Sequence, residues 1–464
     1  MQKTFLFYDI ETSGLNPAFD QIIQFAAIRT DERLNELERY DWVIKPSPDV
    51  VPSPAAMMTH RTPLSIWQKG EPEFMVIKRI HELLNTPGTM SIGYNSFGFD
   101  DEFLRFSFYR NLLSPYTHQY DNLCSRGDVY PITALYYLFH SNILTWPTRN
   151  EKISLKLESL NDCNSLATGV AHTAMVDIEA TIALAKIFMQ RLRTWDYALG
   201  YFDKTEDSAR QKKLPVLFGK KYAIAVDGIF GADANFCAPL LWLGEHYHYK
   251  NQSCWLRLDT ETLSHVTPQE VSMHTWAINK KLAEPGFLLP ASERYQQKLS
   301  ETKKNVLKKN ISWLDNNPEI LSVIKEYYCE FTYPKYENIA PEAALYYQGF
   351  WSSQEKFFAQ KFHEAPHEKK TTVIDNMTSS VLKTLAIHAL ARIDQRLLSV
   401  QQHDLWMEHL AYAKTSPEKV IDHKGKRKLS VDEGLAQLEA LLDSETVDAE
   451  QKSLLQELKK FFQV

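Results

Sequence analysis

The sequence predicts an α/β protein that continues into a β-rich middle part and ends in a helical part. Strand-like and helix-like patterns alternate from residue 1 to about 196. Short strand patterns between turn residues follow from about residue 214, and apolar residues recur at helical spacing from about residue 345. A chain of 464 residues commonly folds into about three domains. We therefore expect domains at residues 1–196, 197–344 and 345–464.

Two strands and two helices of the first part carry the residues of interest. Residues 3–12, KTFLFYDIET, are mostly aromatic or apolar and predict a buried strand. Residues 89–96, TMSIGYNS, predict a second strand. A helix is expected to begin around Asp100 and to run to Arg110, and Thr173 is the expected N-cap of another helix.

Turn signals and helical spacing predict the later elements. The helix that Thr173 caps is expected to end near residues 191–193, and residues 195–201 to lead out of the first part. The charged stretch at 203–213 is interpreted as a surface connection. Short strands are predicted at 214–219, 222–230, 237–243 and 253–259, and helices at 293–315 and 318–330. Stripes of leucine and other apolar residues after residue 345 predict packed helices.

Four carboxylates set in apolar sequence indicate a metal site. Asp9 and Glu11 lie two residues apart on the predicted strand, so both side chains point to the same face. A carboxylate is costly in such surroundings unless it binds a metal or finds a partner, and two on one face repel each other without a cation. Asp100 and Asp177 stand near the starts of their helices. Ligands that are all oxygen favour Mg²⁺ or Mn²⁺ over zinc.

His172 directly precedes the expected helix cap and is the candidate general base, because histidine titrates near neutral pH. Two ions about 3.5–4 Å apart would stabilise the attacking and leaving oxygens of a phosphodiester. Taken singly, the pieces have simpler interpretations: residues 9 and 11 as a strand end, and the histidine as a surface or cap residue. Their combination in this order favours hydrolysis by two metals.

Three motifs carry a resemblance to a known family. DIETSGL at 9–15, NSFGFDD at 95–101 and HTAMVD at 172–177 resemble, in order, the motifs of the DEDD superfamily of exonucleases, histidine subtype. The chain is also similar, along essentially its whole length, to the exodeoxyribonuclease I family of bacterial 3′→5′ exonucleases that act on single-stranded DNA. The segments that carry this wider similarity are 93–116, 154–166, 226–243, 344–356 and 405–414.

The resemblance implies a fold and a chemistry. It implies a ribonuclease-H-like exonuclease domain, an SH3-like domain and a helical C-terminal domain, arranged as a C-shaped clamp that threads one DNA strand towards the metals. Asp9, Glu11, Asp100 and Asp177 would hold two Mg²⁺ ions, for which Mn²⁺ can substitute, and His172 would be the general base. The implied reaction is processive release of 5′-mononucleotides from the 3′ end of single-stranded DNA, in repair or recombination.

The resemblance also implies which residues contact the DNA. The backbone around Thr12, with Glu11, would meet the terminal 3′-hydroxyl, and Leu15 would wedge between the last bases. Further contacts are expected from four side chains: Arg105, Tyr116, Tyr120 and Lys156. The two tyrosines follow a helix in a polar loop, which suits stacking on unpaired bases, worth about 1–3 kcal/mol per base.

The chain departs from the family pattern at a few positions. Lys156 stands where the family usually has arginine, and lysine keeps the charge but loses the bidentate fork. Gly98 stands where another basic residue is frequent. The segment THRTP at 59–63 replaces a more apolar turn, and we expect His60 and Arg61 to be exposed on the surface rather than to contact a phosphate.

The family also binds the acidic, hydrophobic C-terminal tail of single-stranded DNA-binding protein. Lys303 and Lys304 lie about where the family has a basic residue that binds this tail. We therefore expect Lys304 to receive the terminal carboxylate of the tail.

The composition is that of a cytoplasmic protein with an uneven charge distribution. Five cysteines form no CxxC pair and argue against a disulfide framework, and no apolar run approaches the ~20 residues that cross a bilayer. We expect a cytoplasmic monomer. The net charge of −6 is unusual for a protein that binds DNA, but basic clusters can attract phosphates locally. Each cluster alone is interpreted as a solvated face; they lie at 211–213, 219–221, 280–281, 301–310 and 424–428.

Two alternative functions remain open from the sequence. A 3′→5′ exonuclease for short RNA would use the same carboxylates and histidine. A catalytically inactive scaffold that binds single-stranded DNA would belong to a different class, and the intact set of carboxylates argues against it.

Overall fold

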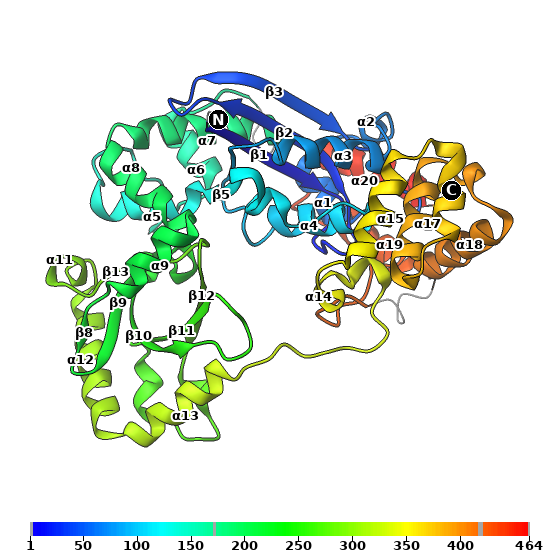
Figure 1. Ribbon diagram of the computed structural model, residues 1–464. Helices are drawn as coiled ribbons and strands as arrows, with labels where there is room; N and C mark the ends of the chain where they lie inside the picture. The colour runs from blue at the N-terminus through cyan, green and yellow to red at the C-terminus, as the bar shows by residue number, and fades with distance from the viewer. Residues whose placement is uncertain (1–2, 170–172, 416–420, 463–464) are drawn as a thin grey trace.

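The computed structural model describes residues 3–169, 173–415 and 421–462. Figure 1 shows three connected parts: an N-terminal α/β part in blue to green, a β-rich part in green, and a helical part in yellow to red. The predicted fold class and the order of its parts are confirmed. Among the described residues, no helix is both long and apolar enough to span a membrane.

A mixed five-stranded sheet forms the centre of the α/β part. Its strands are β1 (Thr4–Thr12), β2 (Ile22–Thr30), β3 (Glu36–Val43), β4 (Thr89–Gly93) and β5 (Ser125–Asp128), in the order β3-β2-β1-β4-β5. β1 pairs antiparallel with β2 and parallel with β4. β1 is almost continuously apolar because both faces are covered: Leu6, Tyr8 and Ile10 enter one core, and Phe5 and Phe7 the other.

The helices of this part cover both faces of the sheet. They are α1 (Pro54–His60), α2 (Leu64–Trp67), α3 (Glu73–Leu84), α4 (Asp100–Arg110), α5 (Val129–Phe139), α6 (Leu157–Asn164), α7 (Ala174–Met189) and α8 (Leu192–Leu199), and a small hairpin joins β6 (Thr148–Arg149) to β7 (Lys152–Ile153). α3 and α4 pack on one face, and α5 and α7 on the other. The strand predictions at 3–12 and 89–96, the helix that begins at Asp100 and the N-cap at Thr173 are confirmed.

The end of this part contains a helix that the sequence did not predict. α7 ends at Met189, and the residues expected to lead out of the domain form α8 and a following 3-10 turn. Trp195 and Tyr201 are buried in the same core as Phe188, because the chain folds back onto the sheet. This core continues into the next part of the chain, so the expected domain boundaries at 196 and 344 stay predictions.

An antiparallel sheet forms the β-rich, SH3-like part. Its strands are β8 (Val216–Leu217), β9 (Lys220–Val226), β10 (Cys237–Glu245), β11 (Gln252–Arg257), β12 (Ala277–Lys281) and β13 (Phe287–Pro290), in the order β12-β11-β10-β9-β13 with β8 beside β9. Its helices are α10 (Val271–His274), α11 (Glu293–Gln296), α12 (Glu301–Asn316) and α13 (Pro318–Cys329). The helix predicted at 293–315 is therefore two helices, because Ser300 begins α12 as its N-cap and accepts a hydrogen bond from the Lys303 backbone N–H.

The charged stretch at 203–213 lies mostly at the surface, as predicted, but it is helical, which the sequence did not predict. It forms helix α9 (Lys204–Lys212), which Asp203 caps by accepting hydrogen bonds from two backbone N–H groups. Asp207, in the middle of α9, is fully buried and lies 2.9 Å from the Nζ of Lys280 on β12. Lys280 is therefore part of a buried ion pair that attaches α9 to the sheet, and not of a solvated basic face.

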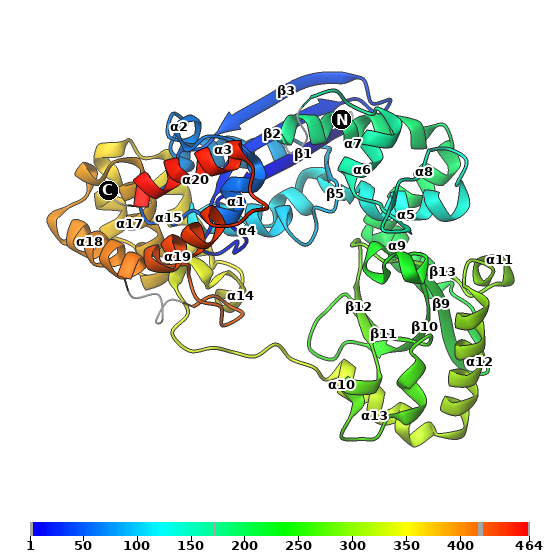
Figure 2. The same ribbon diagram turned by 180° about the vertical axis from the view of Figure 1, so that it is seen from behind.

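The C-terminal part is helical, as predicted. Its helices are α14 (Leu345–Gln348), α15 (Ser353–Glu364), α16 (Lys370–Asp375), α17 (Ser380–Asp394), α18 (Val400–Thr415), α19 (Val431–Leu442) and α20 (Ala449–Phe462). The predicted apolar stripes pack inward, with Leu382, Leu385 and Leu390 buried. Seen from behind in Figure 2, α19 and α20 lie beside α1 and α2, so this part is attached to the α/β part.

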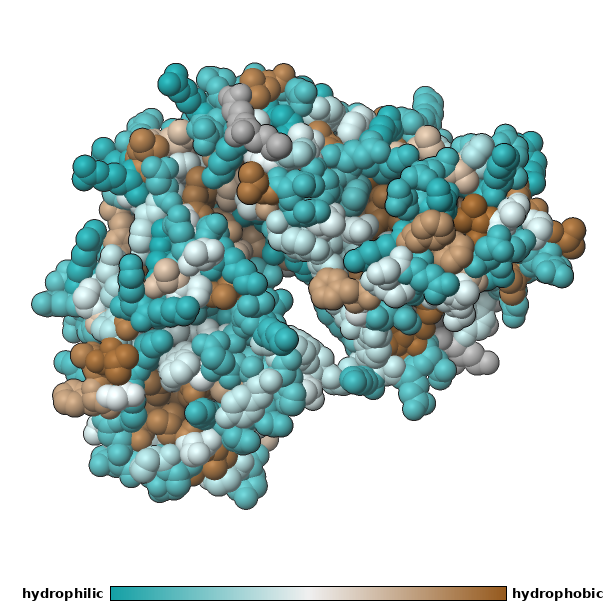
Figure 3. All heavy atoms as spheres, in the orientation of Figure 1, coloured by the Kyte–Doolittle hydropathy of each residue, from teal (hydrophilic) through white to brown (hydrophobic). Residues whose placement is uncertain are grey.

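The three parts form the predicted clamp. The β-rich and helical parts attach to different sides of the α/β part, and an exposed segment at 331–338 joins them to each other (Figure 1). Figure 3 shows an open passage between these two parts, with the joining segment along one side of it. All five cysteines are free, as predicted.

Candidate active site

β1 ends in the two carboxylates that the sequence singled out. Tyr8 and Ile10 face the side of the sheet that α3 and α4 cover. Because side chains alternate along a strand, Asp9 and Glu11 face the opposite side, on which α7 packs. The pairing of β1 with β2 shifts register between Glu11 and Thr12, and such irregularities turn a strand away from its regular course.

The structure brings the other two carboxylates to the same place. Asp100 is the first residue of α4 and is buried, and α7, which carries Asp177, packs on β1. Burial raises the pKa of Asp9 well above its usual range, and the charges of Asp100, Glu11 and Asp177 raise it further. The four side chains therefore share one electrostatic environment.

A divalent cation fits this environment. Burial also raises the pKa of Asp100. A hydrogen bond from its own backbone N–H partly offsets this rise in pKa, and the negative charges of Asp101, Asp128 and Glu11 add to it. A cation among these groups would relieve their repulsion. The donors at positions 9, 11, 100 and 177 are all carboxylate oxygens, which suit Mg²⁺ or Mn²⁺.

Buried hydrogen bonds hold the segment that leads into α4. Asp128, at the end of β5, accepts hydrogen bonds from the backbone N–H groups of Asn95 at 2.8 Å and Ser96 at 3.0 Å. Asp101 accepts a hydrogen bond of 2.9 Å from the Tyr8 hydroxyl and also pairs with Arg126. These contacts fix the start of α4, and with it Asp100, against the sheet.

His60 contradicts the sequence-based expectation of an exposed side chain. It is the last residue of α1, and its side chain is only 11% exposed. Its Nδ1 pairs with the Glu11 carboxylate, and its Nε2 lies 2.8 Å from the Thr12 carbonyl oxygen. A sequence signal was present: Met57 is buried three residues earlier, so helical spacing puts His60 on the inward face of α1. Arg61 is partly exposed, as expected, and pairs with α20.

The predicted general base, His172, lies outside the described residues. Thr12 is buried, and its hydroxyl donates a hydrogen bond of 2.7 Å to the Gly14 carbonyl. Leu15, in the loop after β1, is 81% exposed. The Leu15 side chain projects from this loop into solvent, where a ligand can contact it.

The remaining predicted DNA contacts fall into two groups. Arg105 is buried, donating hydrogen bonds to Glu102 and Gln119, and it lies over the ring of Tyr116, which is half-buried. Tyr120 is 67% exposed, and Lys156 is exposed at the N-cap of α6. Tyr120 and Lys156 can therefore reach a ligand directly, whereas Arg105 is held by its neighbours.

The two lysines predicted to bind a partner lie at the start of α12. The Nζ of Lys303 is 3.0 Å from the buried carboxylate of Asp259, and the Nζ of Lys304 is 2.7 Å from Glu301. Glu301 is largely exposed, so Lys304 can exchange this partner for another carboxylate at little cost.

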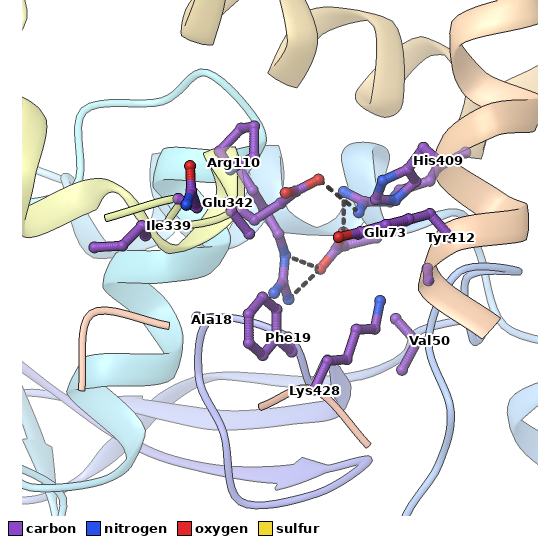
Figure 4. Close-up of a pocket in the computed structure, with 15 residues that line it drawn as sticks. Ala18, Phe19, Val50, Glu73, Arg110, Ile339, Glu342, His409, Tyr412 and Lys428 are labelled. Atoms are coloured by element: carbon purple, nitrogen blue, oxygen red, sulfur yellow. Dashed lines mark hydrogen bonds and ion pairs between the residues drawn. The ribbon is translucent and has the colours of Figure 1, made fainter. Parts of the chain in front are cut away.

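A separate cavity of about 230 Å³ lies between the α/β part and the helical part (Figure 4). The charged side chains that line it are Glu73, Arg110, Glu342, Arg392, His409 and Lys428. None of the four site carboxylates lines it among the described residues. Lys428 is buried here, which corrects its assignment to an exposed basic cluster.

Within the described part of the chain, one cluster of residues of the kinds that bind metals borders this cavity. Ligand atoms of Glu342, His388 and His409 all lie within 4.8 Å of one another. However, Arg392 lies 3.9 Å from Glu342, and His409 is 3.1 Å from Asp49. A permanent cation beside these groups disfavours a divalent ion. We interpret the cluster as an ion-pair network that joins the two parts.

Comparisons with known proteins agree with this geometry. The RNase_T family model, described as "Exonuclease", matches residues 6–185. Exodeoxyribonuclease I of Escherichia coli is 37% identical over 268 residues, which are 56% of this chain and 54% of the relative, so this alignment spans about half of that protein. Exodeoxyribonuclease I of Haemophilus influenzae is 27% identical over 99% of this chain and 98% of its own length.

The solved structures extend the likeness to the whole fold. E. coli exonuclease I in complex with a dA16 oligonucleotide superposes with a TM-score of 0.87 at 25% identity, covering 100% of this chain and 99% of the other. The matched exonuclease domain contains all four site carboxylates. The chain therefore contains a domain of the exonuclease type, and it is similar from end to end to bacterial exodeoxyribonuclease I.

Proposed function

We propose that this protein is a 3′→5′ exodeoxyribonuclease that degrades single-stranded DNA to 5′-mononucleotides. The observation that carries the proposal is the convergence of Asp9, Glu11, Asp100 and Asp177 at one buried place in the exonuclease domain. The full-length likeness to a protein solved with a DNA oligonucleotide supports DNA as the substrate.

Each group of residues would have a separate role in hydrolysis. Asp9, Glu11, Asp100 and Asp177 would hold two divalent ions, Mg²⁺ or Mn²⁺, which when bound supply positive charge to the attacking and leaving oxygens. The backbone at Thr12 would receive the 3′-terminal nucleotide. His172 would accept the proton of the attacking water at an imidazole nitrogen.

Leu15, Tyr120 and Lys156 would guide the strand to this site. Leu15 would separate the last bases, Tyr120 would stack on a base, and Lys156 would pair with a phosphate. The passage in Figure 3 would be the path of the strand, and the joining segment would keep the strand from leaving between cuts. We also propose that digestion is processive, that it serves DNA repair or recombination, and that the enzyme is a cytoplasmic monomer.

The direct test is digestion of matched substrates with Mg²⁺. A single DNA strand labelled at its 5′ end should shorten progressively from its 3′ end and release 5′-mononucleotides, whereas a duplex of the same sequence should be degraded slowly. Omission of the metal should stop the reaction. Faster digestion of an RNA of the same sequence would identify the exoribonuclease instead, and binding without cleavage would identify the inactive scaffold.

We further propose that Lys304, with Lys303, binds the acidic C-terminal tail of single-stranded DNA-binding protein. Lys304→Glu should weaken binding of a tail peptide by about tenfold or more at low salt, because like charges then face each other. Lys309→Glu is the matched control, since Lys309 is exposed on the same helix five residues further on. Equal affinities of the two variants, measured by fluorescence anisotropy, would refute the assignment.

A further inference from the structure

His60 links the end of α1 to the end of β1. Its Nδ1 pairs with the Oε2 of Glu11, and its Nε2 lies 2.8 Å from the carbonyl oxygen of Thr12. Glu11 is one of the four site carboxylates, and Thr12 is the residue whose backbone is expected to meet the 3′-terminal nucleotide. One imidazole therefore contacts both a metal-site carboxylate and the neighbouring part of the substrate site.

The fold fixes this ring from several directions. The ring packs edge-on against the buried Trp67, with centroids 6.0 Å apart and planes at 71°. The start of α1 is attached to the loop after β1, because the Ser53 N–H donates a hydrogen bond of 2.7 Å to the Ser13 carbonyl. These two contacts hold the ring and the start of α1 in place.

The Glu11 carboxylate and the Thr12 carbonyl, which the ring contacts, both need to be held in a fixed orientation. A glutamate side chain has three rotatable bonds, and its carboxylate must be oriented before it can bind a metal with good geometry. Thr12 stands where the pairing of β1 with β2 shifts register, so its carbonyl is not held by a regular ladder. Both partners are hydrogen-bond acceptors, and an imidazole that carries hydrogen on both nitrogens can donate to each of them.

We propose that His60 is a positioning residue that orients the Glu11 carboxylate for metal binding and the Thr12 carbonyl for the 3′ end of the strand. This inference rests on the proposed function, because it assigns a role within that site. A competing interpretation is that His60 is only a packed residue of α1, whose nitrogens are satisfied by chance neighbours.

Three substitutions separate the two contacts. His60→Asn retains a polar group near the position of Nδ1, and His60→Gln retains one near the position of Nε2. His60→Ala removes both. Arg61→Gln is the matched control, because Arg61 is the next residue and its ion pairs go to Asp448 and Glu450 rather than to the site. Melting temperatures of the full-length variants show whether each is folded.

Metal binding is measured without activity, by calorimetric titration of the metal-free protein with Mn²⁺. His60→Ala should weaken Mn²⁺ binding by about 10- to 100-fold, as is typical when an outer partner of a metal ligand is lost. His60→Asn should recover most of this affinity, because it can still support Glu11. Arg61→Gln should bind Mn²⁺ as the wild type does.

Steady-state digestion of a single-stranded oligonucleotide gives the second measurement. His60→Ala should lower kcat and raise KM. His60→Gln should restore KM more than kcat, because it supports Thr12 and not Glu11, and His60→Asn should do the reverse. A packing role alone would not separate kcat from KM in this way.

The outcomes distinguish this inference from the proposed function. A wild-type protein that releases no nucleotides from any strand with Mg²⁺ or Mn²⁺ would refute the function itself. An active wild type whose His60→Ala variant matches Arg61→Gln in Mn²⁺ affinity, kcat and KM would overturn the role of His60 alone. Equal losses in all three His60 variants, with melting temperatures unchanged, would also overturn it, since the two nitrogens would then have no separate roles.

Discussion

Asp9→Asn is expected to slow hydrolysis of single-stranded DNA by about a thousandfold or more, while the strand is still bound with nearly wild-type affinity. The substitution removes one carboxylate from the metal site but keeps the size of the side chain. A divalent ion supplies several kcal/mol of transition-state stabilisation, and each 1.36 kcal/mol corresponds to a factor of ten in rate. Binding of the strand would depend mainly on the proposed contacts of other residues to its phosphates and bases.

The same substitution is expected to raise the melting temperature of the metal-free protein. Burial and three neighbouring carboxylates raise the pKa of Asp9, so the folded state binds its proton more tightly than the unfolded state does. At a pH above this raised value, ionised Asp9 therefore reduces the free energy of unfolding, and a neutral asparagine removes that cost. Mg²⁺ should stabilise the wild type through linkage and stabilise Asp9→Asn much less.

The sheet offers a matched control for this change. Asp41 on β3 lies in the same row as Asp9, because both pair with Ala26 of β2, but it is exposed at the edge of the sheet. Asp41→Asn makes the same chemical change and should leave the rate and the response to Mg²⁺ as they are. If Asp9→Asn kept a rate close to that of Asp41→Asn, Asp9 would have no part in holding a catalytic metal.

The site could be predicted from the sequence where its geometry is local. Asp9 and Glu11 share a face because strand side chains alternate, and Asp100 begins a helix because an apolar helical pattern follows it. The proximity of these residues to Asp177 is not local, because it depends on the parallel pairing of β1 with β4 and on the packing of α7 across the sheet. Only the order of the motifs, matched to a known family, could supply that information.

The incomplete predictions for α9 and His60 have a common physical cause. α9 is so polar that its residues gave no apolar pattern, and its attachment depends on Asp207, whose partner Lys280 is 73 residues away. His60 was judged by residue type, as a polar side chain in a turn, although the helix around it turns it inward. In both cases a buried polar group is stabilised by a distant partner, which no local pattern reveals.

Arg392→Met is expected to destabilise the contact between the helical part and the α/β part by about 3–5 kcal/mol, because it removes one partner of a buried ion pair. Arg392, on α17, is buried and donates to both carboxylate oxygens of Asp49, at 3.1 and 2.6 Å. Asp49 follows β3 and is itself buried; His409 and the Nζ of Lys428 also contact it. The three contacting residues all come from the helical part.

The pH dependence of stability should follow from Asp49. Burial alone would raise its pKa, but the charges and hydrogen bonds of Arg392 and His409 outweigh burial and hold the pKa well below its usual range. A carboxyl group whose pKa is depressed in the folded state contributes stability above its unfolded pKa of about 4, and this contribution is lost as the pH falls through the folded value. Wild type should therefore lose stability below about pH 4, and Arg392→Met should lack much of that dependence.

Urea unfolding, followed by circular dichroism at several pH values, measures both effects. Arg396→Met is the control, because Arg396 is 87% exposed, lies four residues further along the chain and pairs with Asp394. It should unfold as the wild type does. Asp49→Asn combined with Arg392→Met should recover part of the lost stability, since the side chain that loses its arginine partner is then neutral. An Arg392→Met protein as stable as Arg396→Met would mean that the buried network does not hold the helical part in place. Apolar contacts would then maintain the clamp, through α19 and α20 and through the core that α15 and α17 share with α3 and α4.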